Sequence, residues 1–576
     1  LHLALARVLE QTPGVEPDAL VVHYLAGGAR AQALLHMRRS ARHLVDALAF
    51  DRAVSMYKRL LTLSDAGSDA GSDVVVDDRL AVREELAVAL ENAGRCEEAG
   101  RAWLALAEEH TGATRQQLRQ RAADNLIRSG HVDEGLAAQK AALDRLGVRV
   151  SRSAWLALPF IVLDRIRLRL RGLGYRLQPS SHADPRRLAR IDASMALGAV
   201  LPLIDTIRGL QVHGQALRDA LAAGEPARLA RALAMEAGYR NALSGGVDRR
   251  GRIDALLATA GLVAEASGEP RAKGTVAIMY GSARWSVGDW AGCISHCQRG
   301  LERLRGECTG VSWEINFALT HSINALLWSG RLNDHRREAL ASLADARARG
   351  DLYAEVMYSV RDLATLHVQA DAPDAARATR QELERWTNRG FQIEHLVELY
   401  QQSEVMLYEQ RGDEAWAWVT SRWSALRRSQ LLRLQVFRIE LRALRARAAL
   451  CALADLPRGR SRARLVAEAR SLARAIAREA PAVRALVLGA PLTAAVAAID
   501  GRDDAARAAL EAGIHAAQVH GMRLHEAGMQ ACLGHRIGGD VGRAQVADAA
   551  RWMHDQGIAA PARYLRMLAP GLAPEG

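Results

Sequence analysis

Few side chains in this sequence have the types and spacing that chemistry requires, and a short cysteine–histidine group is the clearest case. Cys293, His296 and Cys297 fall within about one and a half turns of a helix, and the two cysteines share a face, as two zinc ligands would. Cys308 is the nearest candidate for a third ligand. Alternatively, Cys293 is a small side chain packed where two helices cross. We favour packing and expect no metal.

The groups that hold nucleotide phosphates are missing from the sequence. The only lysines are Lys58, Lys140 and Lys273, and none follows a glycine as a phosphate-binding loop requires, since Lys273 precedes Gly274. The protein-kinase motifs and the Gly-x-Ser-x-Gly nucleophile elbow are absent as well. We therefore expect no catalytic residue and no cofactor in this chain.

Two apolar features have both a packing and a binding interpretation. Trp285, Trp290, Trp313 and Trp328 gather in the middle of the chain and form either core or a ligand groove on a concave side; we favour core. Residues 155–175 begin apolar and continue with alternating arginine and leucine. They either lie on an anionic membrane surface or dock between two helical arrays with their arginine face in water, and we favour docking.

Composition and charge restrict the classes of protein that remain. The chain has 576 residues and a net charge of +12, and nearly all of its positive charge is arginine interleaved with acids. This pattern predicts a solvated mixed-charge surface and no specific nucleic-acid ligand, although a basic nucleic-acid-associated regulator is the alternative. Six scattered cysteines indicate a reducing cytoplasm. The longest apolar stretch, residues 154–163, is too short for a transmembrane segment.

The elements that must position any site are helices joined by a recurring turn. A glycine is followed by a polar residue and a new helix, a variant without glycine occurs at Asp371, and the units repeat at about 34–45 residues. The glycine permits the left-handed backbone that ends a helix, and the polar residue is expected to cap the next one. These turn residues are Gly94, Gly130, Gly288, Gly330, Asp371, Gly412 and Gly501.

A small side chain generally follows the turn residue by five positions, where two helices must approach closely. These small residues are Ala99, Gly135, Cys293, Ala376, Ala417 and Ala506. His335 breaks the rule after Gly330, and the first unit lacks the glycine but keeps the face formed by Ala53 and Tyr57. The pattern resembles a degenerate, lengthened tetratricopeptide repeat.

The fold class predicted is therefore all-α, a helix-pair solenoid with a right-handed superhelix, in one array or two. We expect an N-terminal array over residues 1–147 with a flexible loop at 64–73, because that loop is a Ser-Asp-Ala-Gly repeat. A linker with an apolar, arginine-rich helix follows at 148–190. A C-terminal array occupies residues 191–570.

Several segments carry a more specific resemblance. The opening resembles the region that follows the ATPase module in large bacterial signalling proteins, and later segments resemble the same family. The segments are residues 1–63, 202–209, 231–237, 307–314, 349–354 and 552–558. The family is the myxobacterial-type serine/threonine protein kinases, which fuse a kinase, a regulatory P-loop ATPase and a tetratricopeptide-like tail. The chain begins at Leu1 inside an amphipathic run, so we expect it to be the tail of a longer protein.

The resemblance implies a non-catalytic sensor region that binds a protein partner or a small effector in its concave groove. Occupancy of the groove would regulate the upstream kinase and ATPase modules. None of the family's catalytic residues can be carried over, because their motifs are absent. Our candidate groove residues are Asp205 and Arg208 in one of the family-like segments, and Trp313 and Glu314 in another.

Overall fold

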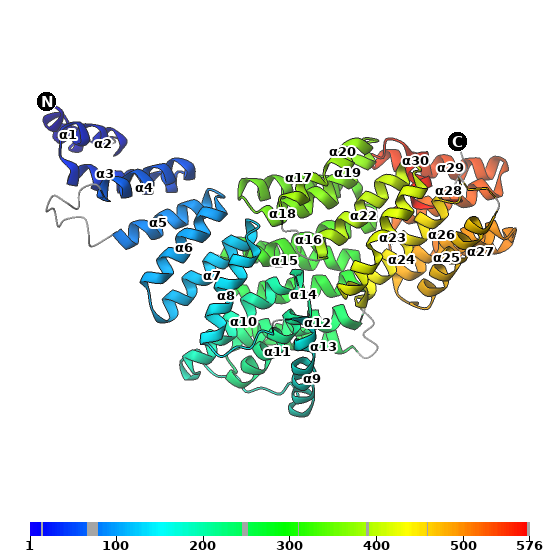
Figure 1. Ribbon diagram of the computed structural model, residues 1–576, viewed down its shortest axis with the longest axis horizontal. Coiled ribbons are helices and arrows are strands. Elements are labelled where there is room, and N and C mark those ends of the chain that lie inside the picture. Colours follow the sequence, from blue (N-terminus) through cyan, green and yellow to red (C-terminus); the bar gives the residue numbers. More distant parts are fainter. Residues whose placement is uncertain are drawn as a thin grey trace. The chain divides into compact units, whose positions relative to one another are not determined.

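The computed structural model describes residues 1–12, 15, 17–65, 79–151, 153–204, 206–244, 251–308, 310–386, 391–454, 456–457 and 459–572. Over these residues the chain is α-helical, with short 3-10 and π segments and no strand (Figure 1). Consecutive helices pack against each other in pairs throughout. The prediction of an all-α array of paired helices is confirmed.

The helices belong to two compact units. Unit 1 comprises Leu1–Arg145 together with Ala344–Glu355, and unit 2 comprises Leu146–Leu343 and Val356–Gly576. The predicted linker at 148–190 therefore forms part of unit 2 and contains one long helix. Within the predicted loop at 64–73, Ser64 and Asp65 are the last residues of a helix, and residues 66–73 lie outside the described ranges.

Unit 1 is a row of helices in which each contacts its neighbours in sequence. Its core contains Met37, Tyr57, Trp103 and Leu106, all almost fully buried. Its helices are α1 (His2–Glu10), α2 (Pro17–Ala26), α3 (Arg30–Asp46), α4 (Phe50–Asp65), α5 (Arg79–Asn92), α6 (Cys96–Glu109), α7 (Gly112–Arg128) and α8 (Val132–Arg145).

The segment Ala344–Glu355 completes unit 1 from the middle of the chain. Asp351 is fully buried and accepts a hydrogen bond from Arg128 at 3.1 Å (Nε to Oδ2). The thiol of Cys96 donates to the carbonyl of Arg349 at 3.3 Å. A Cβ added at Gly94 would collide with the backbone at residues 348–350, so this close approach requires glycine.

Unit 2 holds the remaining helices. The first part runs through α9 (Ala154–Arg171), η3 (Ser180–His182), α10 (Pro185–Ile204), α11 (Thr206–Ala223), α12 (Pro226–Ser244), α13 (Arg252–Ser267), α14 (Pro270–Val287), α15 (Trp290–Glu307) and α16 (Ser312–Ser329). Helices α17 (Leu332–Ala348) and α18 (Leu352–Met357) extend into the segment that belongs to unit 1.

The second part of unit 2 begins with a π segment and ends near the C-terminus. Its elements are η4 (Tyr358–Leu363), α19 (Ala364–Gln369), α20 (Pro373–Ala378), α21 (Gln381–Glu384), α22 (Ile393–Tyr408), α23 (Gly412–Arg428), η5 (Leu431–Arg433), α24 (Gln435–Cys451), α25 (Arg460–Ala477), α26 (Val483–Ile499), α27 (Asp503–Val519), α28 (Arg523–Ile537), α29 (Gly539–Asp555) and α30 (Pro561–Leu568).

The predicted turn residues adopt the left-handed backbone in most units. Gly94, Gly130, Gly288, Gly330 and Gly501 have φ between 72° and 91°, and Asp371 has φ 57°. The small residue five positions later is buried in the corresponding units, at Ala99, Gly135, Cys293, Ala376 and Ala506. The first unit has Leu48 in the left-handed position, with φ 58°, and Ala53 is again five residues later and fully buried.

The predicted position of the turn is wrong in one unit. The left-handed residue there is Gln410, with φ 60°, whereas Gly412 begins α23. The buried small residue is consequently Ala415, and Ala417 is exposed. A non-glycine residue in the left-handed region leaves no signature in the sequence, so the nearby glycine misplaced the turn by two positions.

The polar residue after each turn was expected to cap the next helix, but most turns lack this cap. Asp289 does cap α15, because its Oδ1 accepts a hydrogen bond from the backbone N–H of Gly292 at 2.8 Å. Four other turns carry an arginine at this position, which cannot accept a hydrogen bond. Three of these arginines pair with an acid three residues ahead, in the first turn of the helix: Arg95 with Glu98, Arg331 with Asp334 and Arg411 with Glu414. The fourth, Arg502, pairs with Asp500 of the turn itself.

His335, the residue that breaks the small-residue rule, is fully buried. Its Nε2 lies 3.2 Å from Oδ1 of Asp362, which also pairs with Arg361. Burial alone would raise the pKa of Asp362, but Arg361 and His335 hold it below its usual range. Asp362 lies in the π segment η4, a widened helical turn that faces the larger histidine side chain.

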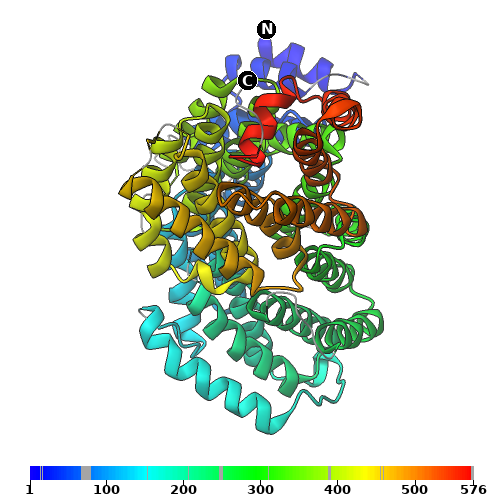
Figure 2. The same cartoon turned by 90° about the vertical axis from the view of Figure 1, so that its right-hand side faces the viewer.

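The array in unit 2 bends until helices far apart in sequence touch. We call α10, α12, α14, α16, α22, α24, α26 and α28 the inner helices. Helices α10, α12, α14 and α16 contact each other in succession, as do α22, α24 and α26, and in addition α16 contacts α28 and α12 contacts α24. Figure 2 shows the late helices, in orange and red, beside the green helices from the middle of the chain. The backbone N–H of Leu332 donates to Oε1 of Gln556 at 3.1 Å, and that of Ala559 to the carbonyl of Gln369 at 2.7 Å.

Candidate ligand cavity in the second unit

The bend in unit 2 leaves a cavity of about 110 Å³ between its inner helices. Its walls come from α16, α19, α22, α24, α26, α28 and α30, so both early and late helices of the unit contribute. Most of the wall is aliphatic, including Leu327, Leu488 and Leu492. The polar and charged side chains that line the cavity include Tyr400, Gln401, Glu404, Arg447, His525 and Tyr564.

An ion pair between Arg447 and Glu404 forms the charged part of the wall. Arg447 on α24 hydrogen-bonds Glu404 on α22 and donates to the carbonyl of Met567 on α30 at 3.2 Å. The two side chains are only 10% and 11% exposed. Burial disfavours the charged guanidinium, but the carboxylate beside it raises the pKa of Arg447. The pair therefore joins three helices and brings no net charge to the cavity.

The Nδ1 atom of His525 is the group in the cavity wall that is available to bind a ligand. It lies on α28, and its ring stacks on Trp328 of α16 with 5.2 Å between ring centroids. Burial, assisted by the charge of Arg447, lowers the pKa of His525 to about 4, so the ring is neutral at pH 7. Among the described residues its Nδ1 has no hydrogen-bond partner.

The two tyrosines of the wall are neutral phenols. Burial raises the pKa of both Tyr400 and Tyr564 above the usual range. Gln401 accepts a hydrogen bond from the hydroxyl of Thr365 at 3.4 Å. The cavity thus combines aliphatic walls with neutral hydrogen-bonding groups and one internally neutralised ion pair, which suits a small molecule that is mostly apolar and carries a few polar atoms.

Three of the four clustered tryptophans surround Arg484 of α26. The guanidinium carbon lies 4.2, 5.0 and 5.1 Å from the ring centroids of Trp285, Trp290 and Trp328. Arg484 is 2% exposed, pairs with Glu440 at 2.8 Å and donates to the carbonyl of Trp285 at 3.1 Å. We call these three rings the aromatic cage. The guanidinium group of Arg484 occupies it.

Trp328 connects the cage and the cavity. One face of its ring stacks on Trp290, at 5.9 Å between centroids, and the ring also stacks on His525. Trp290 and Trp328 are 3% and 8% exposed. The preferred interpretation of these two tryptophans as core matches their burial, and Trp328 is in addition part of the cavity wall.

The candidate groove residues lie elsewhere. Asp205 is outside the described residues, and Arg208 is partly buried in α11. Trp313 and Glu314 lie at the start of α16, and Glu314 accepts two hydrogen bonds from Arg271, at 2.9 and 2.6 Å. None of the three described candidates lines the cavity.

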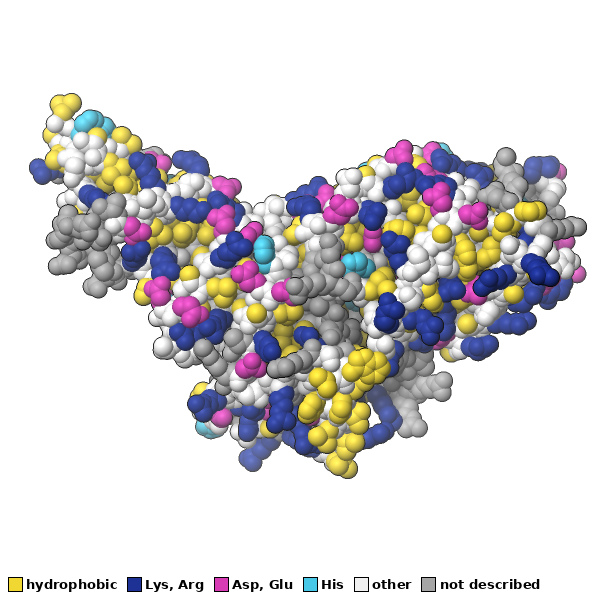
Figure 3. Space-filling view, in the orientation of Figure 1, with side chains coloured by type: hydrophobic (Ala, Val, Ile, Leu, Met, Phe, Trp, Pro, Cys, Tyr) yellow, Lys and Arg dark blue, Asp and Glu magenta, His cyan; other side chains and the backbone are white. Residues whose placement is uncertain are grey.

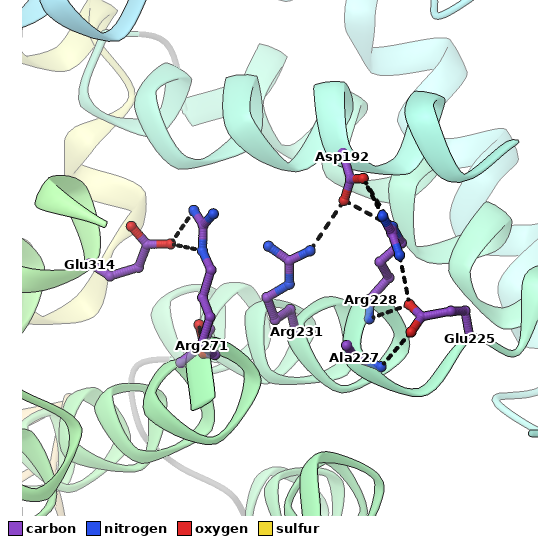
Figure 4. A network of polar contacts seen from close by, with 8 residues as sticks. Asp192, Glu225, Ala227, Arg228, Arg231, Arg271 and Glu314 are labelled. Carbon is purple, nitrogen blue, oxygen red and sulfur yellow. Dashed lines mark hydrogen bonds and ion pairs between the residues drawn. The ribbon is translucent and has the colours of Figure 1, made fainter. Parts of the chain in front are cut away.

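Glu314 belongs to a network of charges that crosses successive inner helices (Figure 4). Asp192 of α10 pairs with Arg228 and Arg231 of α12, at 2.6 and 3.2 Å, and Arg271 of α14 pairs with Glu314 of α16. Burial and the nearby charge of Arg271 lower the pKa of Arg231. Arg228 also pairs with Glu225 at 3.1 Å, so these ion pairs join α10 to α12 and α14 to α16.

The cysteine–histidine group is packed. Cys293 is fully buried, and its thiol donates to the carbonyl of His321 at 3.6 Å. A hydrogen bond with Cys297 and burial raise the pKa of Cys293, which keeps the thiol protonated. Among the described residues there is no group of three or more His, Cys, Asp or Glu side chains that could hold a metal ion.

Sequence reasoning missed the residues that matter most in the cavity. Glu404 ends a run of polar residues, 400–404, in a helix that is buried on nearly all sides. Such a run covers every side of a helical turn and normally indicates a solvated segment, but here the surrounding helices bury it. The available signal was this polar run inside a helix that is otherwise mostly apolar.

Comparisons with known proteins identify no family for this chain. No protein-family model matches this sequence, and no match was found among curated proteins. The functional conclusion has to be drawn from the cavity itself.

Proposed function

We propose that this chain is a non-catalytic sensor region and that unit 2 binds a small effector in the cavity between its inner helices. The observation that carries the proposal is the origin of the cavity wall. Trp328 on α16 and His525 on α28 are almost 200 residues apart, yet they stack on each other at the cavity. A ligand there would contact both ends of the bent array at once.

The chemistry of the wall defines the ligand class. A volume of about 110 Å³ is enough for several waters or one small organic molecule. Aliphatic side chains would cover the apolar body of the ligand, and the Nδ1 of His525 would bind a polar atom. A small, uncharged and mostly apolar effector fits these groups, in preference to a protein partner.

Binding would stabilise the bend. Without a ligand, the early and late helices are joined by contacts such as Leu332 with Gln556 and Arg484 with Trp285. A molecule that touches α16, α24 and α28 together adds contacts that exist only in the bent form, so it shifts the array toward that form. The shape of unit 2 would then report whether the effector is present.

The output of the sensor is inferred from the family resemblance. We propose that the chain is the tail of a cytoplasmic serine/threonine protein kinase and that the bend of unit 2 controls the upstream kinase and ATPase modules. All six cysteines lie in the described part as thiols, which agrees with a reducing compartment. Measuring kinase activity of the full-length protein with and without the effector tests this output.

A cavity-filling substitution tests the binding site. Ala443 lines the cavity, whereas Ala446, on the same helix, is fully buried away from it. We expect small apolar molecules that raise the thermal midpoint of the wild type to have no effect on Ala443→Leu, because leucine occupies their space. Ala446→Leu is the control, which loses stability through overpacking but keeps the ligand response.

Two results would contradict the proposal. If no molecule from a broad library of small metabolites raises the midpoint of the wild type, the proposal fails. If Ala443→Leu responds as strongly as the wild type, the effector binds elsewhere and the cavity is not the site.

A further inference from the structure

Helix α9 has two apolar faces, and only one of them is covered. Ala157, Ile161 and Leu168 are buried, and α9 contacts α11. Asp164, on the same face, pairs with Arg218 of α11 at 3.1 Å. This segment was expected to dock between two helical arrays with its arginine face in water, but its main contact is with α11, on one face of the helix.

The opposite face is apolar and open to solvent. Trp155, Ile166 and Leu170 are 74%, 50% and 84% exposed. These positions and the other exposed members, Leu156, Pro159, Val162 and Leu163, fall on one side of a helix with 100° per residue, opposite the buried face. We call them the α9 stripe. Figure 3 shows the hydrophobic patch over α9, at the lower edge of the view.

Arginines border the α9 stripe on both sides. At 100° per residue, Arg165 and Arg169 lie along one border, and Arg167 and Arg171 along the other. Arg165 pairs with Glu236, and Arg171 donates to backbone carbonyls, so these two have partners within unit 2. Arg169 is exposed, and Arg167 is 55% exposed with only a distant contact, 3.9 Å, to Asp164.

An apolar stripe bordered by arginines is the arrangement of a helix that lies in the plane of a membrane surface. Apolar side chains enter the boundary between headgroups and acyl chains, and arginines extend their stems along it to reach phosphates. Among the described helices, none combines the length and the apolar character that a bilayer crossing requires. A position in the membrane plane needs neither.

We propose that the α9 stripe binds the surface of an anionic lipid bilayer, with Arg167 and Arg169 next to the lipid phosphates. A second copy of the chain fits this surface less well. A two-fold contact through the stripe would place the arginines of one copy near those of the other, in a protein that already carries a net charge of +12. Anionic lipid headgroups supply the opposite charge on both borders.

Vesicle sedimentation tests the proposal with the whole chain. We expect the wild type to sediment with vesicles of phosphatidylcholine and phosphatidylserine, and much less with phosphatidylcholine alone. The double variant Leu163→Glu with Ile166→Glu should lose at least about tenfold in vesicle affinity, because two charges enter the apolar stripe. Arg167→Ala and Arg169→Ala should each cost about fivefold on the anionic vesicles.

Matched controls come from exposed apolar residues elsewhere in unit 2. Leu262 on α13 and Val541 on α29 are 74% and 65% exposed, and their double replacement by glutamate should leave vesicle binding unchanged. All of these positions are on the surface, so circular dichroism should show the wild-type helix content in each variant.

Three outcomes overturn the proposal. The first is that folded wild-type protein sediments with neither kind of vesicle. The second is that it binds both kinds equally, which would remove the role of the arginines. The third is that the chain self-associates through the stripe, seen as a dimer that Leu163→Glu with Ile166→Glu disrupts, while no vesicle binding is found.

Discussion

Units 1 and 2 are built from the same helix pairs but use them differently. In unit 1, helices α1 to α8 contact their neighbours in sequence, and ion pairs such as Lys58 with Glu98 lie on the surface. The buried pair Arg128 with Asp351 forms in this unit only where the segment Ala344–Glu355 is added to the row. In unit 2, the bend brings α16 against α28 and encloses charged pairs such as Arg447 with Glu404. This difference shows that a row of helix pairs encloses a ligand cavity only where its inner helices face each other.

Removing one member of the enclosed pair should have the largest effect. Arg447→Met leaves the carboxylate of Glu404 buried without its partner, so we expect unit 2 to lose about 3–5 kcal/mol of stability. Urea unfolding followed by tryptophan fluorescence measures this, because unit 1 contains only Trp103 of the eleven tryptophans. Combining the change with Glu404→Gln should restore part of the loss.

The corresponding change in unit 1 is the control for this comparison. Lys58 and Glu98 are 46% and 43% exposed, so Lys58→Met should cost less than about 1 kcal/mol. Hydrogen exchange resolved by peptide reports on unit 1 separately. Equal losses in the two units would show that the bend does not bury the Arg447 pair in solution.

Acidic pH should weaken unit 2 through two buried histidines. Burial lowers the pKa of both His321 and His525 to about 4, whereas an unfolded histidine titrates near 6.5. Between these values the unfolded state binds more protons, so stability falls as the pH decreases. Each histidine should remove about 2–3 kcal/mol between pH 7 and pH 4.5.

His525→Phe tests the assignment, since phenylalanine keeps the ring that stacks on Trp328 but cannot be protonated. Urea midpoints measured at pH 7 and pH 4.5 should differ less in this variant than in the wild type. An unchanged difference would mean that His525 is accessible to protons in the folded state.

The turn residues should give the smallest effect, and the same effect in both units. Leu48 in unit 1 and Gln410 in unit 2 each adopt the left-handed backbone. Replacing either by glycine relieves this strain and should stabilise its unit by up to about 1 kcal/mol. Gln410→Gly should gain less than Leu48→Gly, because the side-chain amide of Gln410 donates to the carbonyl of Leu407 at 2.7 Å.

Thermal unfolding combined with hydrogen exchange measures the two gains. Gly330→Ala is the opposite control, because the added Cβ would lie 2.9 Å from the backbone nitrogen of Leu524 and the backbone is left-handed there. A loss of stability in either glycine variant would mean that these turns are not strained.

The sequence was sufficient for the helix pairs but not for the cavity. Glycine in the left-handed region and a small residue five positions later are local requirements, so turns such as Gly94 with Ala99 could be predicted. Gln410 could not, since a non-glycine residue in the left-handed region leaves no signature in the sequence. The bend of unit 2 is the sum of small angles between successive pairs, and no single residue determines it.

The polar residues of the cavity illustrate the same limit. In sequence, Glu404 and Arg447 are ordinary members of charged helices, and their burial depends on α22, α24 and α30 meeting. Trp313 and Glu314 were chosen because they lie in a family-like segment, yet Glu314 pairs with Arg271. Resemblance of short segments did not identify the enclosed residues.

The assignment of Ala344–Glu355 to unit 1 has a consequence for the order in which the protein matures on the ribosome. Arg128 emerges long before Asp351, so a nascent chain that ends between them holds a guanidinium without the counterion that its folded position supplies. The N-terminal unit can reach its final form only after most of the first half of unit 2 has been translated. A recombinant fragment cut after Arg145 would remain at that unfinished stage.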